Sequence, residues 1–300
     1  MRLYHNVFDS NYEYGMRVSS SRTPNVDNVV YLNNIFSRND PYGDWRQVHL
    51  HGGPAETVRF MSNCITGDIP GRNVVDDYDT WTTLAEVQSD EYIQEHGERY
   101  VDNVDVPPEY VAADEYNHAL SETSPLRDAG RPLTATRGTG SGPLLPVEDP
   151  WYFYDGLGID GEVGDMIVIG NNQSARVEKV DLQERELVLD REVEWLDGDP
   201  VGLAWSGAAP DMGVYEYGDG GRPSVQIVAD HFIARPGQEI TLRAVVRGDM
   251  EPSEFIWHTG YEDRMTGQTV SFSRDEPNDY PIRLQVIDSA GNTHRATGYV

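Results

Sequence analysis

The sequence contains almost no lysine, almost no cysteine and no long apolar stretch. Lys179 is the single lysine among 23 basic residues, and Cys64 is the single cysteine. One cysteine excludes an intramolecular disulfide. No segment approaches the run of about 18 apolar residues that a membrane-spanning helix needs. Residues 1–6 also lack the apolar core of a secretory signal peptide.

Acidic residues are abundant instead. Asp and Glu number 51 against 23 Lys and Arg, which gives a formal net charge of −28. Such a charge can prevent collapse, but 17 Tyr, 7 Phe and 6 Trp are spread along the chain, so we expect a folded protein. An acidic surface nearly free of lysine is typical of proteins from very salty surroundings, where the Debye length is about 3 Å at 1 M salt. The charge argues against nucleic acid or an anionic membrane as a partner.

An asparagine recurs at regular spacing in the first part of the chain. Asn6, Asn34 and Asn63 align at intervals of 28 and 29 residues. The segments 29–32 and 58–61 before the second and third asparagine alternate as strands do. A period of this length indicates a solenoid. An asparagine at one turn position suits a ladder of stacked amides.

Two short segments resemble known closing motifs. Residues 124–130 read SPLRDAG and residues 211–218 read DMGVYEYG. Together they resemble the ending "SPAIDAG … DIGAYEYG" of right-handed parallel β-helix proteins of the pectate-lyase-like class, with Arg127 in place of an apolar residue. The resemblance implies that 1–143 and 210–222 form the last coils and closing strand. Because this fold is usually found outside cells, we expect excision from a longer secreted protein or export by another route, such as a virus particle.

The first repeat begins at residue 2 with no capping element before it. An uncapped solenoid end exposes apolar side chains and strand edges. We therefore expect another protein chain or subunit to cover an assembly surface formed by Leu3, Val7 and Phe8. Cys64 shares a column with Val7, so we interpret it as a small core residue.

The remaining segments predict further β-structure. Residues 80–87 indicate a short capped helix, and 138–143 a flexible loop. Four short strands within an insertion at 144–209 favour a small β-barrel or sandwich.

The C-terminal segment, 223–300, predicts a sandwich of about seven strands with a buried Trp257. Its order resembles a PKD-type immunoglobulin-like domain, especially in Trp257 and the ending 284–292. The fold class expected for the whole chain is therefore all-β.

Few residues point to chemistry. In so acidic a chain, carboxylates near an arginine are expected by chance, and we interpret one such set as surface charge: Asp9, Asp27, Arg38, Asp40 and Asp44. His49 and His51 share one face of a strand, but no third metal ligand accompanies them. We therefore predict no catalytic residue, no metal site and no cofactor. Bound calcium is compatible with the fold, but no set of residues in the sequence identifies a site for it.

An aromatic run supplies the candidate binding residues. Trp151, Tyr152 and Tyr154 follow a loop rich in Pro and Gly, and aromatic faces with polar tips suit wet binding surfaces. They are candidate glycan-binding residues, although rings packing the insertion onto the repeats explain the run as well. The segment 172–174 is a glycosylation sequon if the chain is exported.

These features lead to two functional hypotheses. The first is a non-catalytic structural and binding protein of a halophile surface or virus particle, which presents β-folds to glycans or protein partners. The alternative is a carbohydrate-active lyase or hydrolase whose catalytic coils lie upstream.

Overall fold

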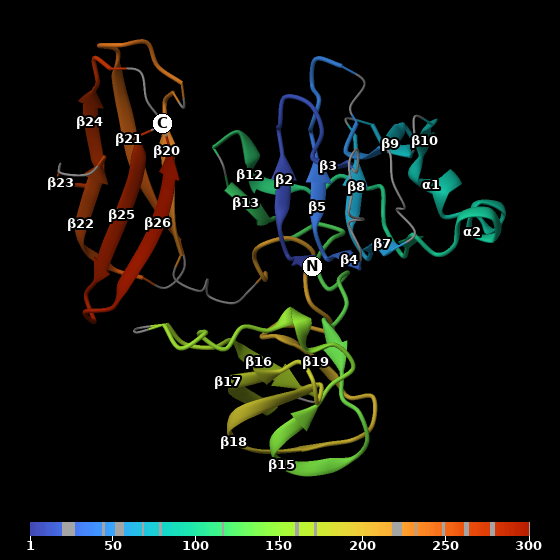
Figure 1. The fold of residues 1–300 in the computed structure, drawn as a ribbon. Coiled ribbons are helices and arrows are strands. Elements are labelled where there is room, and N and C mark those ends of the chain that lie inside the picture. The colour runs from blue at the N-terminus through green and yellow to red at the C-terminus, as the bar shows by residue number, and fades with distance from the viewer. Residues whose placement is uncertain are drawn as a thin grey trace. The chain divides into compact units, whose positions relative to one another are not determined.

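A computed structural model describes residues 1–19, 28–43, 46–51, 57–67, 69–77, 80–115, 117–159, 162–170, 173–217, 224–231, 233–247, 250–260, 264–276 and 280–299. The protein is all-β, as expected, with strands far outnumbering helices. It divides into two compact units, Met1–Tyr217 and Gly218–Val300, which are described separately (Figure 1). Within the described residues, no helix combines the length and apolar character needed to cross a membrane.

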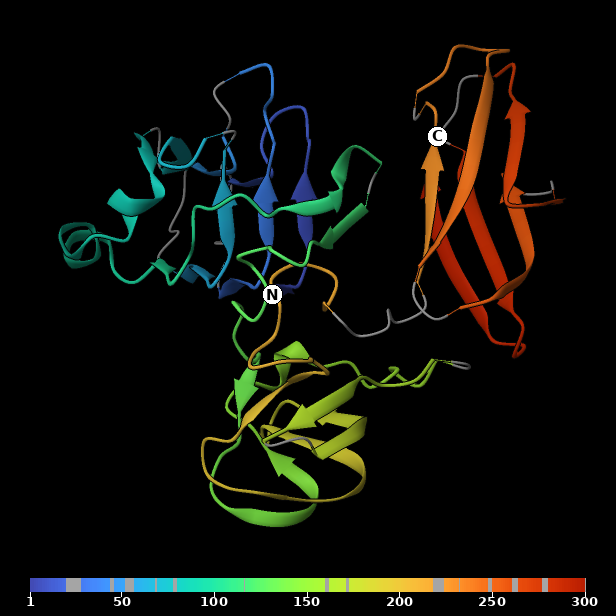
Figure 2. The ribbon, with the colours of Figure 1, turned by 180° about the vertical axis from the view of Figure 1, so that it is seen from behind.

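The first unit opens with three repeats, each contributing one strand to each of three parallel sheets (Figures 1 and 2). The predicted strands 29–32 and 58–61 are confirmed with those bounds. The repeats are β1 (Arg2–Tyr4), β2 (Val7–Asp9) and β3 (Met16–Ser19); β4 (Val29–Leu32), β5 (Ile35–Ser37) and β6 (Val48–His51); β7 (Val58–Met61), β8 (Cys64–Thr66) and β9 (Asn73–Asp77). The sheets are β1-β4-β7-β11, β2-β5-β8 and β3-β6-β9, with β11 at Tyr100–Val101.

Aromatic side chains stack along the repeats in a common core. Tyr31, Phe60 and Tyr100 occupy one register column of the first sheet. The ring centroids of Tyr31 and Phe60 lie 4.5 Å apart, and those of Phe60 and Tyr100 lie 5.2 Å apart. Phe8 stacks on Phe36 at 4.7 Å in the second sheet. All five contribute to a single hydrophobic cluster, so each repeat buries its apolar face against its neighbours.

The outer faces of the three sheets differ. Leu32 on the first sheet joins the core of the inserted domain. Ile35 and Cys64 on the second sheet pack against the closing segments, which confirms Cys64 as a core residue, and burial raises the pKa of its thiol to about 12. The third sheet instead carries His49 and Asp76, paired in register.

The two closing segments lie together, as the sequence predicts. The Gly130 amide donates to the Pro210 carbonyl at 2.8 Å, and the Met212 amide to the Leu126 carbonyl at 3.1 Å. Leu126 is fully buried. Arg127 is tolerated beside it because its guanidinium lies over the ring of Tyr217, 3.5 Å from the centroid.

The short helix begins later than expected. Residues Thr80–Thr83 form strand β10, antiparallel to β9. Helix α1 spans Leu84–Val87, with a capping box between Thr83 and Glu86, and α2 spans Asp90–His96. Thr83 is therefore the N-cap of the predicted helix, because its side chain accepts a hydrogen bond from the Glu86 amide.

The insertion is a closed barrel, and it starts earlier than predicted. Its strands are β14 (Thr134–Ala135), β15 (Gly140–Pro146), β16 (Met166–Ile169), β17 (Gln173–Asp181), β18 (Glu186–Trp195) and β19 (Pro200–Leu203). The order is β14-β19-β16-β17-β18-β15, and a bridge between Thr136 and Val147 joins the two ends. The expected flexible loop 138–143 was wrong over 140–143. Gly140 pairs with Trp195 of β18, and a glycine is needed there because a Cβ would lie 2.8 Å from the Trp195 ring.

In the second unit, the described residues form a sandwich of seven strands with Trp257 fully buried, as predicted. The indole Nε1 donates to the Gly267 carbonyl at 2.8 Å. Asp288 holds the last turn by accepting from the Asn292 amide at 2.8 Å. One sheet is β20 (Ser224–Ala229), β21 (Glu239–Arg247) and β24 (Thr269–Ser273); the other is β23 (Arg264–Thr266), β22 (Pro252–Thr259), β25 (Pro281–Asp288) and β26 (Thr293–Tyr299).

Candidate functional surfaces

The predicted asparagine ladder is present and has a further rung. The side-chain amide of Asn6 donates to Asn34 at 3.0 Å, Asn34 to Asn63 at 2.9 Å, and Asn63 to Asn103 at 2.9 Å. Each asparagine follows a residue with left-handed backbone: His5, Asn33, Ser62 and Asp102. The sequence pattern missed Asn103 because α1 and α2 lengthen the last interval to 40 residues.

The ladder ends in an acceptor at the first repeat. Asn34 Oδ1 accepts from both the backbone and side-chain nitrogens of Asn6, each at 3.0 Å. Asn6 is exposed, and its own Oδ1 receives no donor from any described residue. A second ladder repeats this pattern, because Asn11 donates to Asn39 at 2.7 Å while the Asn11 side-chain oxygen receives nothing from the described chain.

The candidate assembly residues Leu3, Val7 and Phe8 lie at this same end. They belong to β1 and β2, which with β3 are the outermost strands of their three parallel sheets. All three side chains are half-buried. Leu3 and Phe8 pack on the common core, whereas Val7 packs toward the closing segments. No described strand pairs with the outer edges of β1, β2 and β3.

The aromatic candidates have unequal exposure. Asp149 caps a short 3-10 helix, Pro150–Tyr152. That turn directs Trp151 outward, 60 % exposed, and Tyr152 inward, 6 % exposed. Tyr152 lies in the barrel core, so its faces cannot both stack on a sugar, and this part of the prediction needs correction. Tyr154 is half-buried.

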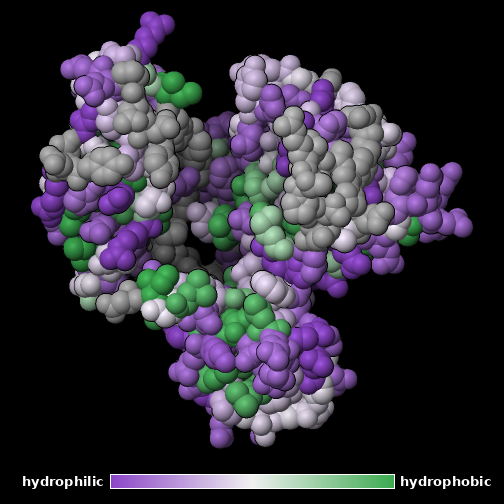
Figure 3. Space-filling view, viewed as in Figure 1, coloured by the Kyte–Doolittle hydropathy of each residue, from purple (hydrophilic) through white to green (hydrophobic). Residues whose placement is uncertain are grey.

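Apolar residues are also exposed just beyond this run. Leu157, Ile159 and Val163 are all exposed. Figure 3 shows hydrophobic residues on the segment between β15 and β16, within a largely hydrophilic surface. Asn172 of the sequon lies outside the described residues. Together with Trp151, these three apolar residues give the segment before β16 an exposed apolar surface.

Asp9 is an organised buried carboxylate rather than chance surface charge. Its side chain is 4 % exposed. It accepts from Ser37 Oγ at 2.8 Å and from Arg38 Nε at 2.9 Å, and lies 3.1 Å from His118 Nε2. Burial opposes its ionisation, but the hydrogen bonds from His118, Arg38 and Ser37 outweigh burial and hold the pKa of Asp9 well below its usual range.

This cluster ties a hairpin to the first repeat. His118 belongs to the hairpin of β12 (Tyr110–Ala112) and β13 (Asn117–Leu120). Both carboxylate oxygens of Asp9 have protein hydrogen-bond partners, so these contacts hold the hairpin against the first repeat. Asp40 lies 3.8 Å from Arg46, while Asp27 and Asp44 lie outside the described residues.

The polar face of the third sheet brings the histidines together with residues that the sequence pattern did not single out. The rings of His49 and His51 lie 5.6 Å apart. His49 Nε2 lies 3.7 Å from the Asp76 carboxylate. Arg46 lies over the rings of Tyr14 and Trp81 at 5.6 Å and 5.7 Å.

The polar face of the third sheet, in its described residues, holds no arrangement of metal ligands. Among the described residues, no group of three or more His, Cys, Asp or Glu side chains is arranged to hold a metal ion. Trp81 is partly exposed beside the charged groups. Asp76 could not be found from local pattern, because it lies 27 positions after His49 and faces it only through the register between β6 and β9.

Comparisons with known proteins give limited similarity. No protein-family model matches the sequence, and no curated protein matches it. Among solved structures, the PKD1 domain of Vibrio anguillarum Epp is 19 % identical, with 26 % of this chain and 89 % of that chain covered and a TM-score of 0.23. The PKD1 domain of the Vibrio cholerae metalloprotease PrtV is 20 % identical, with 26 % and 95 % covered and a TM-score of 0.22.

Proposed function

We propose that this protein is a non-catalytic structural and binding component of an assembly outside the cell, on a halophile surface or a virus particle. In this proposal the three repeats are coils of a right-handed parallel β-helix, and the C-terminal sandwich is a PKD-type domain. The first repeat receives another polypeptide chain, and the barrel presents Trp151 to glycans or protein partners.

The carrying observation is that both amide ladders end in an acceptor at the same end of the repeats. Asn6 and Asn11 are exposed, and their side-chain oxygens receive no donor from the described residues, whereas Asn34 Oδ1 and Asn39 Oδ1 each receive two. Unpaired strand edges are templates for pairing with another chain. Three such edges and two acceptors in one place favour a docking surface.

The ladder polarity also specifies the partner's chemistry. A second copy of this chain related by a two-fold axis would bring acceptor against acceptor at Asn6. A polypeptide of different sequence, running parallel to β1 and placing an amide donor over Asn6, continues the hydrogen-bond pattern. Half-buried Leu3 and Phe8 would then lose their remaining exposure, which contributes about 25 cal/mol per Å² of apolar area removed from water.

The test is to determine the mass of the native high-salt assembly and to identify the neighbour of the first repeat. A photoreactive residue at exposed Ser10 should cross-link to a second polypeptide. Val7→Asp with Phe8→Asp should release the chain from that assembly, whereas Leu196→Asp, at an exposed barrel position, should not. A native protein that is a stable monomer, with an ordered and solvent-exposed first repeat, would contradict the proposal.

A further inference from the structure

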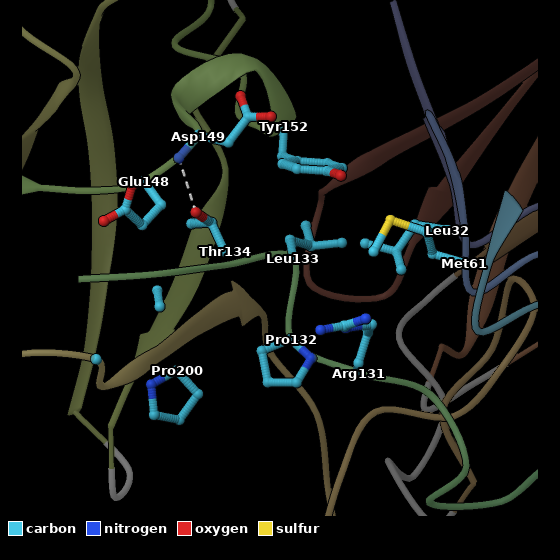
Figure 4. Close-up of a pocket in the computed structure, with 12 residues that line it drawn as sticks. Leu32, Met61, Arg131, Pro132, Leu133, Thr134, Glu148, Asp149, Tyr152 and Pro200 are labelled. Atoms are coloured by element: carbon cyan, nitrogen blue, oxygen red, sulfur yellow. Dashed lines mark hydrogen bonds between the residues drawn. The ribbon is translucent and has the colours of Figure 1, made fainter. Parts of the chain in front are cut away.

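A pocket of about 400 Å³ opens between the inserted barrel and the outer face of the sheet β1-β4-β7-β11. Leu32 and Met61 of that sheet line one side, and Leu133 and Tyr152 of the insertion line the other (Figure 4). Leu32, Leu133 and Tyr152 are buried members of one hydrophobic core. Because packed interiors are rigid, these walls are preformed, and the volume falls in the usual range of about 300–1,000 Å³ for small-molecule sites.

Two carboxylates line the pocket, but both are engaged by arginines of this chain. Asp149 Oδ2 accepts from Arg2 Nε at 2.8 Å and from Nη2 at 2.7 Å. Glu148 Oε2 lies 2.9 Å from Arg185 Nη2. Figure 4 shows the Glu148 carboxyl group directed away from Met61. The pocket therefore offers little to attract a cation.

Arg131 is the charged group that the pocket leaves available. Its backbone is fixed to the second repeat, because the Arg131 amide donates to Asn33 Oδ1 at 2.9 Å and Asn33 Nδ2 donates to the Arg131 carbonyl at 2.7 Å. Among the described residues, the ionic partner of the guanidinium is Asp102 at a distant 4.0 Å, and both side chains are exposed. Exposed pairs of this kind are worth about 0–1 kcal/mol, so a ligand anion can replace Asp102.

We propose that this pocket binds a small carboxylate that carries an apolar body. The carboxylate lies on the Arg131 guanidinium, whose planar fork matches it in geometry. The body lies against Leu32, Met61 and Tyr152. Thr134 is a further polar group at the wall: its Oγ1 accepts from the Asp149 amide at 2.9 Å, and its hydroxyl proton remains for a ligand oxygen.

The ligand has two sources with the same chemistry, a free short-chain acid or the C-terminal apolar residue of a polypeptide. The site does not depend on the open end of the repeats, because Leu3, Val7 and Phe8 are not among its lining residues. The pocket can therefore bind a carboxylate even if no chain docks on the first repeat, and a chain can dock there even if the pocket binds nothing.

Calorimetry with the full chain in about 2 M KCl, where charge repulsion is screened, tests the proposal. The probes are hexanoate and acetyl-Ala-Ala-Leu, each compared with its neutral amide. We expect at least one acid to bind about tenfold or more tightly than its amide. Binding of hexanoate identifies free acids as ligands, and binding of the peptide acid alone identifies a chain terminus.

Two matched arginine variants provide the control. Arg131→Gln should weaken binding of the acid by about tenfold or more, to the level of the amide. Arg191→Gln, at an exposed ion pair with Asp190 on β18, should leave it unchanged. Equal binding of acid and amide, equal binding by Arg131→Gln and the unmodified chain, or no binding of either acid overturns the proposal.

Discussion

Replacing Asn63 by alanine should test the asparagine ladder most severely. Asn63 is fully buried. Its oxygen accepts from the Asn34 backbone and side-chain nitrogens, each at 2.9 Å, and its amide donates to Asn103 at 2.9 Å and to the Tyr31 carbonyl at 3.0 Å. Alanine leaves both Asn34 donors and the Tyr31 carbonyl without these partners, while Asn103 Oδ1 keeps the donation from the Asn63 backbone amide at 3.0 Å. At about 1–3 kcal/mol for each group stranded, partly offset by relaxation, we expect a loss of about 3–5 kcal/mol.

The matched control is Asn6→Ala at the exposed end of the same ladder. It removes the side-chain donations to Asn34 and to the Tyr4 carbonyl, but leaves the backbone donation to Asn34 in place. We expect about 0.5–1 kcal/mol, because water replaces the lost partners.

Hydrogen exchange of the β4 and β7 amides is the appropriate assay. A single global transition is not defined for a protein of two units, whereas exchange reports the opening free energy of each segment. If Asn63→Ala and Asn6→Ala lower the protection of β4 and β7 by the same amount, the ladder does not stabilise the repeats in the way its geometry indicates.

Three further predictions follow from charge, titration and close packing. With a formal charge of −28, the thermal midpoint of each unit's own transition should rise between about 0.1 and 3 M KCl, and midpoints that stay flat contradict halophilic adaptation. The depressed pKa of Asp9 means that it stabilises the fold above its unfolded pKa, near 4, and that this contribution is lost as the pH falls. Asp9→Asn should therefore flatten the acid limb of the stability profile, and an unchanged limb refutes this role. Gly164→Ala should cost about 2 kcal/mol or more, because a Cβ there overlaps the Val177 carbonyl; unchanged exchange protection of β17 would refute it.

Local pattern was sufficient where a feature recurs or where a motif is continuous in sequence. The strand periods at 29–32 and 58–61 and the aligned Asn34 and Asn63 could be read directly, because every repeat sets the same requirement at the same turn. Trp257 could be assigned to a core because it ends the apolar run Phe255–Trp257 in a segment whose order of strands resembles a PKD-type domain. These features depend on neighbours within a few positions.

Features that depend on distant contacts could not be predicted in this way. Gly140 belongs to a strand because it pairs with Trp195 of β18, and nothing near Gly140 in sequence indicates that partner. Trp151 and Tyr152 are adjacent, yet one is exposed and the other buried, because the turn capped by Asp149 sets their directions. The pocket beside Arg131 likewise requires the barrel and the repeats to be placed together.

The unequal intervals of the ladder have a consequence for how such a chain can grow. Successive rungs are separated by 28, 29 and 40 residues, yet the amide contacts stay the same length. New sequence can therefore enter between rungs without shifting the register of the repeats, as α1 and α2 do. The barrel enters on the same principle: the hydrogen bond between Gly130 and Pro210 holds its entry and exit points together. Evolution can thus add or exchange whole domains at these points while the stacked repeats remain unchanged.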